Sequence, residues 1–151
     1  MIEVGRYNPR TDEEGLKALF EDFIQNKSYF QVSWEQFKKE LDKRVLDLTE
    51  RNGMITAKED GKLVGWGTYS QFTDYLGNIR VLIHQVMTFK QDSYKRGIEE
   101  QIIRELEKYI KNTLKIDKAY YLCTDTDSSL RSLFLKLGIK KSDYIWYEKM
   151  L

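Results

Sequence analysis

Two consecutive turn residues, Asp60 and Gly61, constrain the fold of this chain most strongly. They interrupt the stretch "MITAKEDGKLVGWGTYS", residues 54–70, in which apolar, strand-forming segments stand on both sides of the turn. Asp-Gly between two such segments is the strongest short-range signal for a β-hairpin, because both residues tolerate the backbone conformations that a tight turn requires. The sequence therefore predicts a pair of antiparallel strands near the centre of the chain.

Four other segments have the apolar spacing that is typical of amphipathic helices. Capping residues and glycines indicate where they begin and end. In chain order, the signals are a Thr11–Glu14 capping box, a Ser33–Gln36 capping box whose helix should stop at Gly53, an apolar face over residues 98–114, and a short helix closed by Gly138.

Further strands are predicted where β-branched and aromatic residues gather. A strand–helix–strand–helix–strand order follows the hairpin, and this order predicts a mixed sheet with helices on its faces. The predicted strands are "IEVGRY" (2–7), a long strand "NIRVLIHQVMTF" (78–89), "KAYYLCT" (118–124) and a closing strand "DYIWYEKML" (143–151).

Composition excludes several classes of protein. The 151 residues are 41% hydrophobic, too apolar for a disordered chain, and the length suits one domain over residues 1–151. The net charge of +1 does not favour nucleic acid or an anionic membrane surface, and no apolar run is long enough to span a bilayer. Because the start does not resemble a signal peptide, we expect a cytoplasmic protein. One cysteine and one histidine exclude an internal disulfide and argue against a metal site.

Four stretches together resemble the GNAT superfamily of acyl-CoA-dependent N-acetyltransferases, over nearly the full chain. They are "DGKLVGWGTYS", "VMTFKQDSYKRGIEEQII", "DSSLRSLFLKLGI" and "YIWYEKML". The resemblance implies an α/β (α+β) fold with a mixed, mostly antiparallel central sheet of about six or seven strands, flanked by about four helices. It also implies acetyl-CoA as co-substrate and an amine, on a small molecule or a peptide, as acceptor.

The resemblance places the pyrophosphate of coenzyme A on the backbone amides of residues 94–99. A helix N-terminus offers unpaired N–H groups and a partial positive charge, and Gly97 allows close backbone approach. Alternatively, Gly97 merely begins a helix whose charged residues are solvated. The coenzyme-binding positions that the resemblance implies are Met87, Phe89, Tyr94, Lys95, Arg96, Gly97, Ile98, Glu99, Asp127 and Phe134.

The sequence departs from the family pattern at four of these positions. Glu99 stands at the second motif glycine, where its charge either suits the helix dipole or opposes a phosphate. Tyr94 replaces a Gln or Arg, and Asp127 replaces an asparagine and can serve as a helix cap. Phe134 occupies the position of the tyrosine that protonates the leaving thiolate, and it cannot act as an acid.

His84 is the candidate general base. An amine with a pKa of about 10.4 must lose a proton before it attacks, and an imidazole with a pKa of about 6.5 can accept one. His84 lies on the predicted long strand, near where the family often places its base. A packed or surface histidine is the alternative, and Glu59 and Asp74 are weaker candidates for the same role.

Other conspicuous residues have a structural and a functional interpretation. The aromatics of "NKSYFQVSW", Tyr29, Phe30 and Trp34, either line an acceptor pocket or pack in the core. Cys123 ends a strand near the expected thioester, but the family transfers its acetyl group directly, so we expect no nucleophile there. The missing hydroxyl of Phe134 can be replaced by one of the strand tyrosines Tyr120, Tyr121, Tyr144 and Tyr147.

Two functions remain open on the sequence alone. One is an N-acetyltransferase with an unidentified amine acceptor, and the other is a protein of the same fold that binds acyl-CoA or a protein partner without catalysis. A homodimer is common in the family and is a further expectation.

Overall fold

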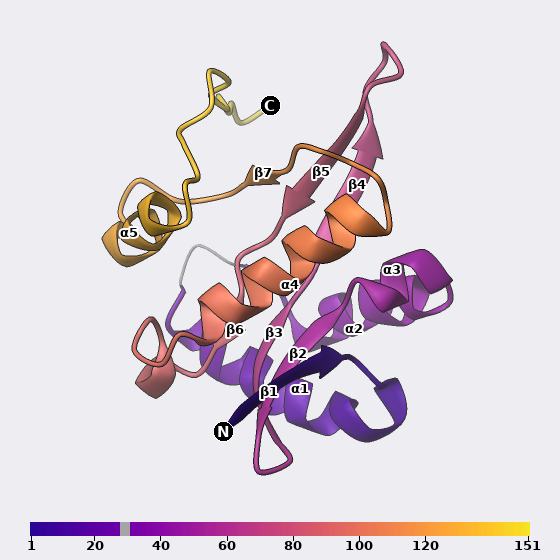
Figure 1. Ribbon diagram of the computed structural model, residues 1–151, viewed down its shortest axis with the longest axis vertical. Coiled ribbons are helices and arrows are strands. Elements are labelled where there is room, and N and C mark those ends of the chain that lie inside the picture. Colours follow the sequence, from indigo (N-terminus) through magenta and orange to yellow (C-terminus); the bar gives the residue numbers. More distant parts are fainter. Residues whose placement is uncertain (28–30) are drawn as a thin grey trace.

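The computed structural model describes residues 1–27 and 31–151, which form seven β-strands and five α-helices with one 3-10 helix. Their order follows the predicted succession except for an additional helix, α3, an additional strand, β4, the division of the predicted long strand into β5 and β6, and the lack of a closing strand among the described residues (Figure 1). The elements are β1 (Ile2–Arg6), α1 (Pro9–Gln25), α2 (Trp34–Val45), α3 (Leu48–Asn52), β2 (Ile55–Glu59), β3 (Lys62–Gly67), β4 (Tyr69–Thr73), β5 (Ile79–Ile83), β6 (Met87–Thr88), η1 (Lys90–Asp92), α4 (Ile98–Asn112), β7 (Tyr120–Tyr121) and α5 (Ser128–Lys136).

The strands form two sheets. One is antiparallel throughout, in the order β1-β2-β3-β6, with the predicted hairpin of β2 and β3 turning at Asp60 and Gly61. The other has the order β4-β5-β7, in which β4 and β5 are antiparallel and β5 and β7 are parallel. The mixed, mostly antiparallel architecture is confirmed, with the seven strands divided between the two sheets.

The single long strand predicted over residues 78–89 is wrong, because its two ends pair in different sheets. Residues Ile79–Ile83 pair with β4, and Met87–Thr88 pair with β3. The last hydrogen bond on the β4 side joins the His84 N–H to the Thr68 carbonyl, at 3.1 Å. Only Thr68 separates β3 of the first sheet from β4 of the second. The chain therefore passes from one sheet to the other at Thr68 and again at His84, and these two residues are hydrogen-bonded neighbours.

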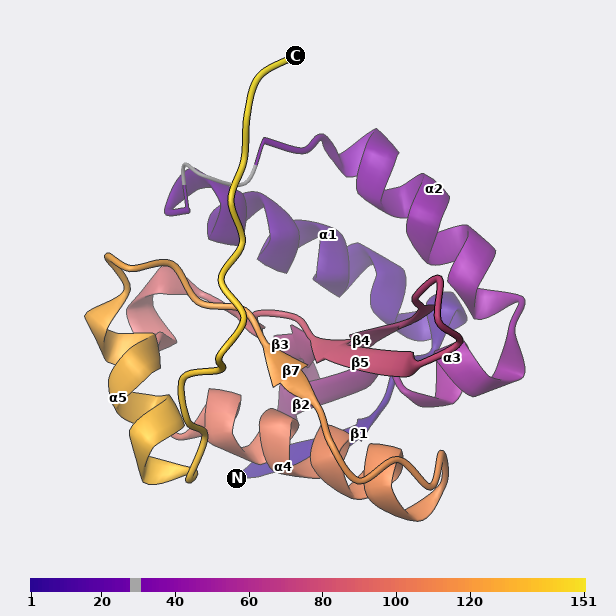
Figure 2. The ribbon, with the colours of Figure 1, turned by 90° about the horizontal axis from the view of Figure 1, so that it is seen from above.

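Helices cover both faces of the sheets. Figure 2 shows α1 and α2 on one side of the strands and α4 on the other. Two apolar clusters fill the interfaces, one under α4 and one under α1 and α2. Helix α4 lies so close to β3 that a Cβ on Gly65 would stand 2.6 Å from Ile98 Cγ2. This contact fixes where α4 begins relative to the sheet.

Two helix boundaries differ from the predictions. Helix α1 begins at Pro9 and not at a Thr11 cap, because Asn8 caps it and the Asp12 carboxylate accepts the Asn8 N–H at 2.8 Å. The second helix does not run to Gly53. Asp47 accepts the N–H groups of Thr49 and Glu50 and so starts a separate helix, α3, which makes five α-helices instead of about four.

The predicted closing strand is also wrong. Residues 140–151 form no strand, and Tyr144, Trp146 and Tyr147 have exposed fractions of 69%, 83% and 91%. Strand β7, the outer strand of its sheet, is only two residues long, so its edge offers too short a ladder to order a neighbouring strand.

Candidate functional site

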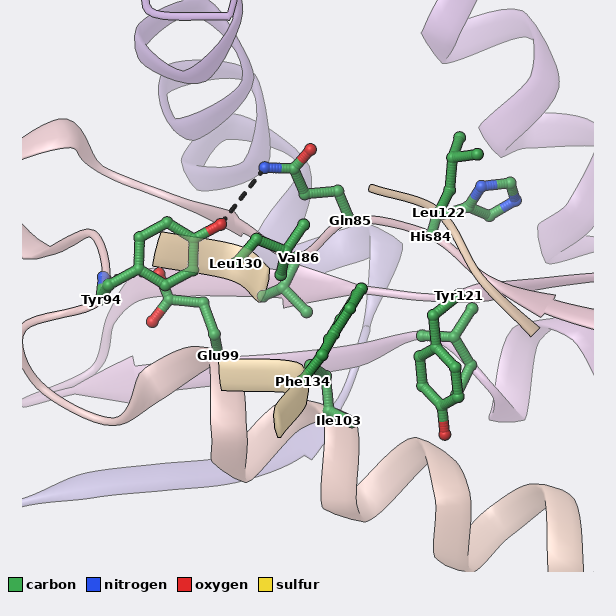
Figure 3. A pocket seen from close by; sticks show the side chains of 11 residues that line it. His84, Gln85, Val86, Tyr94, Glu99, Ile103, Tyr121, Leu122, Leu130 and Phe134 are labelled. Carbon is green, nitrogen blue, oxygen red and sulfur yellow. Dashed lines mark hydrogen bonds between the residues drawn. The ribbon is translucent and has the colours of Figure 1, made fainter. Parts of the chain in front are cut away.

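A narrow slot lies where the two sheets diverge. The loop between β5 and β6 forms one wall with His84, Gln85 and Val86 (Figure 3). Its cavity volume of about 10 Å³ is close to what one water requires, so side chains fill most of it. The remaining walls come from β5, the loop before α4, α4 itself, β7 with the residue after it, and α5. In that order, the lining residues are Ile83; Tyr94; Glu99 and Ile103; Tyr121 and Leu122; and Leu130 and Phe134.

The N-terminus of α4 lies beside this slot and has no side-chain cap. Its first residue is preceded by Gly97, whose φ of 71° is left-handed and whose missing Cβ leaves open space. The other four α-helices of the described chain are each capped by a side chain, from Asn8, Ser33, Asp47 and Asp127. The first amides of α4 therefore point out of a positive helix end, an arrangement that can bind an anion.

The two basic residues before Gly97 have different environments. Lys95 is exposed. Arg96 forms an ion pair with Glu59 and lies 3.6 Å from the Asp92 carboxylate. The hydrogen bond from Arg96 lowers the pKa of the Glu59 carboxyl. Glu59 thus forms an ion pair with the loop before α4, and it does not line the slot as a base would.

Glu99 is buried and turns toward the loop. Its Oε2 atom accepts the Tyr94 N–H and the Thr88 hydroxyl, both at 2.9 Å, and its exposed fraction is 3%. The interpretation of Glu99 as a solvated first-turn residue is therefore wrong. Its carboxylate therefore already accepts the Tyr94 N–H, one of the backbone amides of residues 94–99 that were predicted to bind the pyrophosphate.

Asp127 does more than cap α5. Its Oδ1 atom accepts the Leu130 N–H at 3.0 Å. Its Oδ2 atom lies 3.3 Å from the Lys27 ammonium, 3.4 Å from Gln85 Nε2 and 3.5 Å from the Tyr94 hydroxyl. These contacts join the segment just after α1, the β5–β6 loop, the loop before α4 and the start of α5 across one side of the slot.

His84 is held by a polar chain from α2. Its Nε2 atom forms a short hydrogen bond with the Ser70 hydroxyl, which accepts an N–H of Arg44 at 2.9 Å. Burial, followed by the charge of Arg44, lowers the pKa of His84. The imidazole is therefore neutral at neutral pH. When Nε2 carries the proton that Ser70 accepts, Nδ1 keeps a lone pair that can take a proton.

Phe134 lines the slot, and its ring packs edge-on against Tyr121 at 5.6 Å. The Tyr121 hydroxyl donates to Glu107, while burial raises its pKa, and the Tyr120 hydroxyl accepts from Arg80. The other two tyrosines proposed as substitutes lie in the exposed C-terminal segment. Tyr94, which stands outside these strands, also lines the slot and carries a further hydroxyl.

A larger cavity of about 430 Å³ opens on the α1 and α2 side of the sheets. It shares His84, Gln85 and Leu122 with the slot, so the two spaces meet at these residues. Met87 lines the cavity, and both Met87 and Phe89 pack against the apolar cluster under α1 and α2. The Lys62 ammonium lies 5.1 Å from the centre of the Phe89 ring.

Other sequence candidates lie in different places. Trp34 packs against Phe20 and Phe37, with ring centroids 5.6 and 5.7 Å away, and the predictions for Tyr29 and Phe30 concern residues outside the described ranges. Asp74 pairs with Arg80 at the β4–β5 turn and lies outside the slot and the cavity. Cys123 lines the cavity, and burial raises the pKa of its thiol, so it is not an activated nucleophile.

Residues that the sequence did not identify complete the site. Arg44, Ser70 and Gln85 belong to no sequence motif, and the Ser70 hydroxyl links Arg44 of α2 to His84. No group of three metal-binding side chains occurs in the part of the chain that the structure describes, and none of its helices has the length and apolarity to cross a membrane.

Comparisons with known proteins agree on the fold. The profile of the acetyltransferase (GNAT) family matches residues 16–139, and no curated protein matches the sequence. A possible acetyltransferase from Clostridium difficile 630 is similar, with a TM-score of 0.78 and 13% identity over 100% of this chain and 98% of that one.

Two further solved structures are similar over nearly their whole length. The aminoglycoside N-acetyltransferase AAC(6')-Iy in complex with CoA has a TM-score of 0.78 and 12% identity, over 99% of this chain and 95% of its own. Glucosamine-6-phosphate N-acetyltransferase from Arabidopsis thaliana has a TM-score of 0.71 and 12% identity, over 99% and 98%.

Proposed function

Because the chain belongs to the acetyltransferase (GNAT) family, we propose that it transfers an acetyl group from acetyl-CoA to an amine. The observation that carries this proposal is the meeting of two spaces at His84. The slot beside the open end of α4 and the large cavity share this histidine and Gln85. A coenzyme in the slot and an amine in the cavity would approach one another there.

The proposed site for the coenzyme is the N-terminus of α4. The uncapped amides after Gly97, with Lys95 beside them, would bind the pyrophosphate, while Arg96 would act through its ion pair with Glu59. Tyr94, Glu99 and Phe134 fill the slot and must give way to a ligand. Ile98, Met87, Phe89 and Asp127 complete the set proposed from the sequence.

The proposed reaction is direct transfer. Acetyl-CoA supplies an activated acetyl thioester. His84 takes one proton from the ammonium form of the amine, and the amine nitrogen then forms the C–N bond as the C–S bond breaks, while its second proton passes to solvent. The electron pair of the broken bond stays on sulfur, which is protonated from solvent. A thiol pKa of about 8.5 makes that anion an acceptable leaving group.

We expect acetyl-CoA to stabilise the protein. At about 100 times its Kd, it should add about 2.7 kcal/mol to the free energy of unfolding, which a thermal-shift titration measures. Release of the free thiol in the presence of amines then tests transfer. No stabilisation by any acyl-CoA would contradict the proposal.

A second function, acyl-CoA binding without catalysis, is favoured by one observation. Phe134 lacks the hydroxyl of the family's acid, and Tyr121 beside it donates to Glu107. Stabilisation by acetyl-CoA without transfer to any amine would select this function. A cytoplasmic location, a single domain over residues 1–151 and a homodimer stay predictions.

Replacing Phe134 by tyrosine should raise kcat, because the new hydroxyl extends from a ring that already lines the slot. Positioned proton transfer supplies about 10²-fold or more, which sets the upper range of the gain. Steady-state acetylation across pH compares the two forms. An equal kcat at every pH, in a protein that turns over, would mean that another donor already protonates the sulfur.

A further inference from the structure

The walls of the large cavity are mainly apolar and aromatic. Phe20 stacks on Phe37 at 5.0 Å, and Phe37 meets Trp66 edge-on at 5.4 Å. These three rings line the cavity together with aliphatic residues that include Val32 and Leu41. The volume of about 430 Å³ lies in the range of small-molecule sites. An occupant would therefore bury most of its body against hydrocarbon.

The charged groups in the walls neutralise one another. Among the described residues that line the cavity, the acidic and basic side chains are Glu40, Arg44 and His84, and the imidazole of His84 is neutral at neutral pH. Arg44 Nε donates to the Glu40 carboxylate at 2.7 Å, and its two other nitrogens donate to the Tyr69 carbonyl and the Ser70 hydroxyl at 2.9 Å. The cavity thus offers one carboxylate, already paired, to a cationic ligand.

A ligand with several ammonium groups would lose hydration here without gaining ion pairs, which is costly. A ligand with one amine has a place for it at His84, where a proton can be accepted, and its apolar body gains contact with the walls. Aromatic bodies gain further, because edge-to-face and offset contacts with ring walls are favourable.

We propose that the acceptor is a small arylalkylamine, a primary amine with one positive charge on an aromatic hydrocarbon body. This inference rests on the proposed function and adds the class of its acceptor. The proposed acceptor differs from those of the structurally similar aminoglycoside and glucosamine-6-phosphate N-acetyltransferases, because aminoglycosides and glucosamine 6-phosphate are strongly polar.

The test compares four amines in steady-state transfer from acetyl-CoA: phenethylamine, sisomicin, glucosamine 6-phosphate and a peptide with an N-terminal alanine. We expect kcat/KM for phenethylamine to exceed that of each other amine by at least about 10²-fold. An equal or higher kcat/KM for any of the other three overturns the inference. That result leaves the proposed function intact, whereas absence of stabilisation by acetyl-CoA removes both.

A matched pair of variants locates the preference in the cavity. Val32→Asp adds a carboxylate to the wall from the loop before α2, and Gln31→Asp adds the same charge at the neighbouring exposed residue, which does not line the cavity. Val32→Asp should lower kcat/KM for phenethylamine by about tenfold or more, while Gln31→Asp should not. Equal effects of the two variants would contradict the inference. The acetyl-CoA thermal shift verifies that both proteins are folded.

Discussion

Replacing His84 by alanine is expected to lower kcat by about 10² to 10⁴-fold, the usual cost of losing a general base. The Kd for acetyl-CoA should change little, because the imidazole acts on the proton of the acceptor. His84 lines both the slot and the cavity, and Ser70 holds its Nε2 atom. Single-turnover acetylation and a binding titration separate the two quantities.

The pH dependence gives this prediction a second readout. The pKa of His84 is lowered by burial and by Arg44, so the neutral base persists below the pH at which an ordinary histidine is protonated. The rate should therefore fall only at a pH below that ordinary value. Arg44→Met removes one cause of the shift, so the acidic fall in rate should move to higher pH.

The control for His84→Ala is the conservative variant His84→Gln, which retains a hydrogen-bonding side chain but cannot accept a proton near neutral pH. Both variants should lose activity equally if His84 is the base. Full activity in His84→Gln, with loss of folded protein in His84→Ala, would show that the histidine only packs.

Replacing Gly97 by aspartate is expected to raise the Kd for acetyl-CoA by about 10²-fold. The new carboxylate would stand at the uncapped end of α4, where we propose that the pyrophosphate binds, and opposed like charges cost several kcal/mol. Apart from Gly97 itself and its two chain neighbours, no residue places an atom within 4 Å of a Cβ at this position, so the side chain has room to fit. Isothermal titration with acetyl-CoA measures the change.

Gly97→Asn is the matched control, because asparagine has nearly the same shape and also tolerates a left-handed backbone. Both variants bear the same cost at a φ of 71°, so the ratio of their Kd values isolates the charge. If the two bind acetyl-CoA equally, the anion does not approach Gly97 and the coenzyme site must be moved.

Local signals predicted much of the fold. The Asp60-Gly61 hairpin, the Ser33 cap and the helix after Gly97 all appear where they were expected. Each depends on residues only a few positions apart, so the sequence displays it directly. The Thr11 cap failed for a related reason, since Asn8 followed by a proline is the stronger start signal.

Non-local pairing explains the wrong predictions. Residues 78–89 have strand character throughout, but their partner strands belong to two sheets, and the chain changes sheet at His84. The apolar pattern of residues 143–151 is that of a strand, yet strand formation also requires a neighbouring edge, which the two-residue β7 does not provide. The residue pattern of a strand does not specify which other strand it pairs with.

The sequence by itself determined the hairpin, the open helix start at Gly97 and the absence of a tyrosine at position 134, because backbone geometry and side-chain chemistry act within a few residues. Only the tertiary structure decided that Glu99 turns into the loop and that Arg44 reaches His84 through Ser70. The same packing brings the slot and the large cavity together at His84. Residues so far apart in sequence meet only when burial of apolar faces sets how the helices lie on the two diverging sheets.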